Sequence, residues 1–171
     1  KSIKLSIKKS IKNPLSKDSV LFFGSIFGKS KKQGTSMRMP LSTCMPTKLC
    51  AAACYAHDVL DAAPNAVVRG VINGLIAELY EEGNNNTRDK IMENLKSDIK
   101  RGIANSKKEL NLIQNGFKRK PRIRFSHVGE IASYPIFANA LAYQINEISQ
   151  GEVQCINYTR HSNVNLLNPE Y

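Results

Sequence analysis

The sequence predicts an α/β fold: a small open sheet or partial barrel of mainly parallel strands with βαβ units, and a cysteine-rich loop near the N-terminal third. The 171 residues suit a single domain, residues 1–171, and fall short of the roughly 250 that an eight-stranded barrel needs. The composition, 42% hydrophobic and 23% charged, is that of a folded chain. Segments with strand-like and helical spacing alternate along the second half.

The first 43 residues contain one clear strand signal. Residues 1–17 repeat Ser-Ile-Lys three times and are expected to form a basic N-terminal arm or strand. Residues 19–24 are apolar and bounded by glycine, which is typical of a buried strand. Residues 28–43 combine Gly, Ser, Lys and Pro without periodic apolar spacing, so we expect a loop that leads into the cysteines.

Helices are expected in the middle of the chain. Residues 65–82 place valine, isoleucine and leucine at helical spacing, and Gly83 ends the run. Thr87 is the expected N-cap of a second helix that continues to about Ala104. A further helical stretch after it is expected to stop at Gly116.

The last third predicts a strand, a helix and another strand. Residues 122–127 alternate as a strand does, and His127 ends it. Ser133 is the expected N-cap of the helix that follows, Gly151 closes this helix, and residues 152–159 form the next strand. Such a connection pairs the two strands in parallel. Because ligands bind at the carboxyl ends of parallel strands, His127 is a candidate proton-transfer or cofactor-binding group, with a buried core histidine as the alternative.

The net charge of +11 is concentrated near the N-terminus. Residues 1–48 carry eleven lysines and arginines against the single acid Asp18, and residues 118–122 form a second basic run. We expect this N-terminal segment to bind nucleic acid or another anionic partner, unless it serves only as a solubilising arm. No apolar run is long enough for a membrane helix and no secretory signal is evident, which predicts a cytoplasmic protein without a membrane partner.

Three cysteines, Cys44, Cys50 and Cys54, lie within eleven residues, so their thiolates can converge on one metal centre. Thiolates select zinc or iron–sulfur clusters over hard cations. The first gap of five residues is longer than in structural zinc sites, which favours a [4Fe–4S] cluster. Zinc completed by His57 or Cys155 remains an alternative, as do thiol redox chemistry and three packed core residues. Cys155, inside a predicted strand, is either a fourth ligand or a small core residue.

Three motifs together resemble a known family. They are Thr43-Cys44…Cys50…Cys54-Tyr55-Ala56, then Arg124-Phe125-Ser126-His127-Val128-Gly129-Glu130, and then Asn157-Tyr158-Thr159-Arg160. This order resembles the phage "gene product 88" family, whose members look like shortened relatives of radical-SAM proteins. The resemblance covers residues 43–160 and implies a phage-carried iron–sulfur protein of the host cytoplasm. It also implies that Gly129 and Glu130 contact the amino-acid part of S-adenosylmethionine, although the cysteine gaps of five and three differ from the radical-SAM C-x₃-C-x₂-C.

Two functions follow from these patterns. The first is a redox or radical-SAM-like iron–sulfur protein that works with a redox partner. The second is a non-catalytic basic module, stapled by zinc or a cluster, that binds nucleic acid or virion proteins. The sequence contains no Walker loop, no G-x-S-x-G and no H-E-x-x-H motif, so it carries no signal for a nucleotide motor or for the hydrolases that use those motifs.

Overall fold

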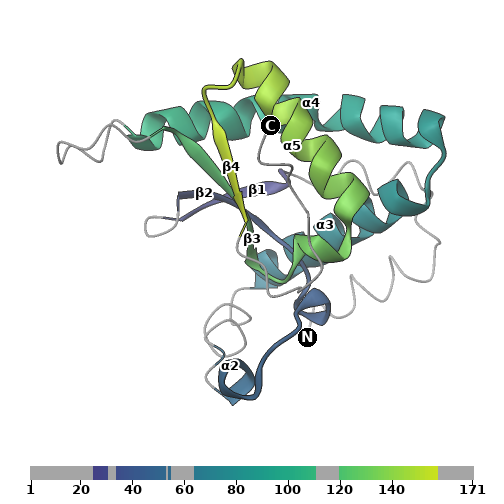
Figure 1. The fold of residues 1–171 in the computed structure, drawn as a ribbon, viewed down its shortest axis with the longest axis vertical. Coiled ribbons are helices and arrows are strands. Elements are labelled where there is room, and N and C mark those ends of the chain that lie inside the picture. Colours follow the sequence, from purple (N-terminus) through teal and green to yellow (C-terminus); the bar gives the residue numbers. More distant parts are fainter. Residues whose placement is uncertain (1–24, 31–33, 53, 55–63, 111–119, 158–171) are drawn as a thin grey trace.

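The computed structural model describes residues 25–30, 34–52, 54, 64–110 and 120–157 (Figure 1). The side chains of Cys50 and His127 are not described, although both residues lie inside these ranges. The expected arm 1–17 and the expected strand 19–24 lie outside the described residues. The elements follow the order β1 (Phe27–Ser30), β2 (Gly34–Arg38), the 3-10 helix η2 (Leu41–Thr43), α2 (Lys48–Ala52), α3 (Pro64–Glu82), α4 (Asn85–Leu110), β3 (Arg122–Val128), the 3-10 helix η4 (Ile131–Ser133), α5 (Pro135–Ser149) and β4 (Gln154–Asn157).

The described strands form one open four-stranded sheet in the order β1-β2-β3-β4. β1 and β2 are antiparallel, whereas β2 pairs with β3 and β3 with β4 in parallel. In the last pair Arg122 lies opposite Gln154 and Phe125 opposite Asn157. The expected α/β class with mainly parallel strands is therefore confirmed for this part of the chain.

The hairpin β1–β2 overturns the expected loop over residues 28–43. Its ladder runs from Phe27 opposite Met37 to Ser30 opposite Gly34. Met37 is fully buried, yet Ser36 and Arg38 on either side of it are buried as well. A half-exposed strand is identified by side chains that alternate between apolar and polar, and this alternation is missing here because polar and apolar side chains are both buried. Tertiary packing thus overrides a weak strand propensity.

The helices cover the sheet with one apolar core. α4 packs against β1, β2 and β3, α5 packs against β4, and α3, α4 and α5 pack against one another. The most deeply buried large side chains include Ile99, Ile123, Phe125, Phe137, Leu141 and Ile145. None of the helices in the described ranges combines the length and the apolar character needed to cross a bilayer.

α4 runs without a break from the second expected helix into the further helical stretch expected after it, of which residues 111–116 lie outside the described residues. It begins at Asn85 rather than after Thr87, because Asn84 Oδ1 accepts hydrogen bonds from Thr87 N and Thr87 Oγ1 at 3.0 and 3.1 Å. The helix passes the expected end at Ala104 and continues to Leu110. Gly102 lies inside the helix, where the ring of Phe27 packs against it and leaves no room for a Cβ.

The start of α5 also differs from the prediction. Ser133 belongs to η4, and Tyr134 is the N-cap, but the Tyr134 side chain makes no capping bond. Glu81, at the end of α3, replaces that cap: its Oε1 accepts a hydrogen bond from Phe137 N at 2.9 Å. A residue 56 positions away thus satisfies the amide that local sequence leaves open.

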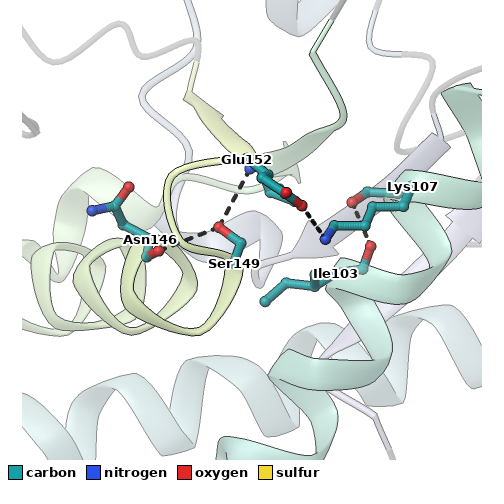
Figure 2. Close-up of polar contacts among 7 residues, drawn as sticks. Ile103, Lys107, Asn146, Ser149 and Glu152 are labelled. Carbon is teal, nitrogen blue, oxygen red and sulfur yellow. Dashed lines mark hydrogen bonds and ion pairs between the residues drawn. The ribbon is translucent and has the colours of Figure 1, made fainter.

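The turn between α5 and β4 is fixed to α4 by side chains (Figure 2). Ser149 Oγ donates to Asn146 O and accepts from Val153 N, both at 3.3 Å. Glu152 forms an ion pair with Lys107 of α4. These contacts set the point at which β4 enters the sheet.

Removing the distant cap should weaken the fold measurably. Glu81→Ala leaves the Phe137 amide without its acceptor, so the free energy of unfolding should fall by about 1 kcal/mol in urea denaturation. The exposed neighbour Glu82 provides the control, and Glu82→Ala should change the free energy of unfolding by less than about 0.5 kcal/mol. Equal effects of both variants would contradict the assigned cap.

Candidate functional site

The chain segments that leave β2 and β3 meet at one edge of the sheet, which we call the carboxyl edge. They comprise residues 39–44 after β2 and residues 129–133 after β3, and Asn157 of β4 lies beside them. Met39 N donates a hydrogen bond to Val128 O at 2.7 Å and so extends the pairing of β2 with β3. This edge is where open α/β sheets bind ligands.

Gly129 allows the two segments to approach closely. Its φ is +74°, and a Cβ at this position would lie 2.5 Å from the backbone of Met39 and from Pro40 O. Any side chain would therefore clash as well as strain the backbone. The role that the structure gives Gly129 is this turn.

Thr43 ties the cysteine-bearing segment to the end of β3. Its Oγ1 donates to Pro40 O and accepts from Glu130 N, each at 2.7 Å. Ser133 Oγ donates to Thr43 O at 3.4 Å. The next residue, Cys44, is thus held at the carboxyl edge, where its amide donates to Leu41 O at 3.0 Å.

Glu130 is a buried acid at this edge, with 6% of its surface exposed. Its Oε1 accepts from Ala132 N at 3.3 Å and from Asn157 Nδ2 at 3.5 Å. Asn157 Oδ1 is buried and has no hydrogen-bond partner within the described ranges. The carboxylate and this amide oxygen together could accept hydrogen bonds from an ammonium or hydroxyl group of a bound molecule.

The cysteine segment projects from the sheet. Cys44 follows η2, Cys50 lies in α2, and Cys54 comes two residues after that helix, which stands apart from the sheet at the bottom of Figure 1. Cys44 and Cys54 are half-buried. Among the side chains that the structure describes, no three His, Cys, Asp or Glu residues are grouped to hold a metal ion, and Cys50 is outside that set.

Cys155 occupies a different environment. It lies opposite Ile123 near the start of β3 and packs against the hydrophobic core. Asn157, two residues further along β4, reaches the carboxyl edge and bonds to Glu130, whereas Cys155 packs against the core. Burial raises the pKa of the Cys155 thiol to about 12. This placement favours the core role among the alternatives for Cys155.

Several expected groups lie outside the described residues, namely His57 and the 158–161 segment, together with the side chain of His127 in β3. Conversely, sequence reasoning did not single out a cavity of about 220 Å³ between the segment after β2 and the first half of α3. Its lining is Arg38, Met39, Pro40, Leu41, Ser42, Val67, Gly70 and Val71. Sequence reasoning also did not identify Thr43 as an anchor of the cysteine segment, because a threonine before a cysteine carries no signal of its tertiary partner.

Comparison with known proteins finds no matching family model, no matching curated protein and no matching solved structure. The resemblance to the phage family therefore stays a prediction.

A pair of glycine variants tests the close approach at Gly129. Gly151 has a similar φ of +72° but ample space around it, so Gly151→Ala should cost only the backbone strain, about 1 kcal/mol. Gly129→Ala adds a clash with backbone and should lower the free energy of unfolding by roughly 3 kcal/mol or more. Denaturant titration measures both, and similar losses would contradict the assigned contact.

The thiol of Cys155 should be chemically inert in the folded protein. With a pKa of about 12, the neutral form dominates, and only about one thiol in ten thousand is ionised at pH 8. Mass spectrometry after iodoacetamide treatment of metal-free protein at pH 8 should find Cys155 unmodified, and modified once urea is added. Rapid modification of Cys155 in the native protein would show that this thiol is not desolvated.

Proposed function

We propose that this chain is an iron–sulfur protein in which Cys44, Cys50 and Cys54 hold a [4Fe–4S] cluster beside the carboxyl edge. The observation that supports this most is the shortness and exposure of α2, the helix that carries Cys50. α2 has five residues, and Leu49 within it is 85% exposed. A helix this short is not stable alone, and it has no buried large apolar residue among its described side chains. Metal–thiolate bonds would supply the missing stabilisation.

The residues fit a three-cysteine centre by the chemistry of their donors. Three thiolates on one short segment suit a cluster with one iron left for another ligand. Cys155 is not part of the proposed set, because its thiol packs against the hydrophobic core and burial raises its pKa. A bound cluster would supply one-electron transfer to a redox partner.

Glu130 extends the proposal to a small molecule. Its carboxylate and Asn157 Oδ1 offer hydrogen-bond acceptors on the same edge as Cys44. S-adenosylmethionine, whose ammonium group such acceptors suit, is the molecule that the family resemblance suggests. The strand–helix–strand spacing further suggests that the sheet is a partial barrel of βαβ units. The sequence also suggests a cytoplasmic protein, and a reducing cytoplasm would keep thiols available for metals.

Metal analysis of anaerobically purified protein tests the cluster. We expect about four iron and four sulfide per chain, with visible absorption that bleaches on adding dithionite. Cys44→Ser, Cys50→Ser and Cys54→Ser should each lose most of the iron. Cys155→Ala is the matched control and should keep it.

Two results would contradict the proposal in different ways. If the protein is colourless and contains one zinc per chain, the cysteines hold a structural zinc in place of a cluster, which favours the non-catalytic basic module. Loss of iron in Cys155→Ala would make Cys155 the fourth ligand and leave no open iron.

A further inference from the structure

Basic side chains from three separate parts of the chain gather at the end of the sheet opposite the cysteines. We call this group the amino-edge patch. Its described members are Lys29 of β1, Lys107 and Lys108 in the last turn of α4, Lys120, and Arg122 at the start of β3. The sequence pattern singles out residues 118–122 as a basic run, and the fold brings Lys29 and the end of α4 to its described members.

The β1–β2 end of the patch is joined directly to α4. Lys29 pairs with Thr35 across the hairpin. Thr35 N and Thr35 Oγ1 both donate to the carboxylate of Glu109, at 2.8 and 2.9 Å. Lys29 therefore lies next to the end of α4, which carries Lys107 and Lys108.

The β3–β4 end of the patch meets the same helix end. Pro121 O accepts a hydrogen bond from Gln154 N at 2.8 Å, and Glu152, just before that strand, pairs with Lys107. Figure 1 shows the end of α4 and the start of β3 side by side at the left. Topology thus brings together basic residues that are up to 93 positions apart, Lys29 and Arg122.

Two acids, Glu109 and Glu152, lie among the five cations, so the patch keeps a net positive charge. Glu109 accepts hydrogen bonds from Thr35, and Glu152 forms an ion pair with Lys107. The other members are exposed and form no ion pair with any residue of the described ranges: Lys29, Lys108, Lys120 and Arg122.

We propose that the amino-edge patch binds the phosphate backbone of a nucleic acid without reading its bases. Cations spread over a helix end and two strands suit a row of phosphates. Among the described residues, the exposed large apolar and aromatic side chains lie on α2, α3, α5 and the segment before α2, not on β1, the end of α4 or the start of β3. The patch therefore offers no aromatic ring for base stacking and no apolar side chain to insert into a bilayer, which favours a phosphate backbone over a membrane. This inference does not depend on the proposed cluster.

Fluorescence anisotropy with a labelled DNA duplex of about 20 base pairs tests the patch in the full chain. The triple variant Lys108→Gln, Lys120→Gln, Arg122→Gln should bind at least ~10-fold more weakly near 0.1 M salt, and the slope of log affinity against log salt should fall by about 2 to 3. The matched control, Lys90→Gln, Lys96→Gln, Lys100→Gln, removes the same charge from exposed positions earlier on α4 and should stay within about 3-fold of wild type.

Three outcomes would overturn the proposal. Equal losses in both triples would mean attraction by net charge alone. Unchanged duplex binding in the patch triple would assign binding to another segment. Loss of binding to phosphatidylserine vesicles, with duplex binding intact, would assign the patch to a membrane surface. Circular dichroism melting checks folding, and Lys120→Glu, at a residue outside the helices and strands, repeats the test if the triple variant unfolds.

Discussion

The backbone of Gly129 lies so close to Met39 and Pro40 that no side chain fits between them, and much of the molecule depends on this contact. It allows the segment after β2 to cross the end of β3, where Thr43 bonds to Glu130 N. Because Thr43 is fixed there, the next residue, Cys44, lies at the carboxyl edge, and the rest of the cysteine segment projects away from the sheet. A peptide–peptide contact without side chains thus sets the position of the candidate centre.

The two ends of the sheet differ in chemistry. The carboxyl edge has thiols and the buried Glu130, whereas the amino edge has exposed cations held by α4. The length of α4 makes this separation possible, because one helix contacts β1, β2 and β3 and ends beside the first residues of β3. Parallel strands place their carboxyl ends on one side, so each end of the sheet brings together residues from distant parts of the chain.

Long, strongly periodic segments were predicted well. The helix expected over 65–82 is α3, Pro64–Glu82, and the strand expected over 122–127 is β3, because amphipathic spacing reports directly which face is buried. Helix starts were predicted poorly. Thr87 and Ser133 are both good capping residues by type, yet Asn84 caps α4 and the remote Glu81 caps the α5 amide, which local sequence cannot indicate. The hairpin was missed because Ser36 and Arg38 are polar and buried.

The sequence by itself determined the fold class, the main helices and the presence of three closely spaced thiols, since each of these is a local property of composition and spacing. Only the tertiary structure decided which of these groups are neighbours. It packed Cys155 against the core opposite Ile123, joined Thr43 to Glu130, and brought Lys29 to the end of α4. The reason is that strand register and helix docking minimise the apolar surface that the whole chain exposes, and a local sequence pattern does not contain this information.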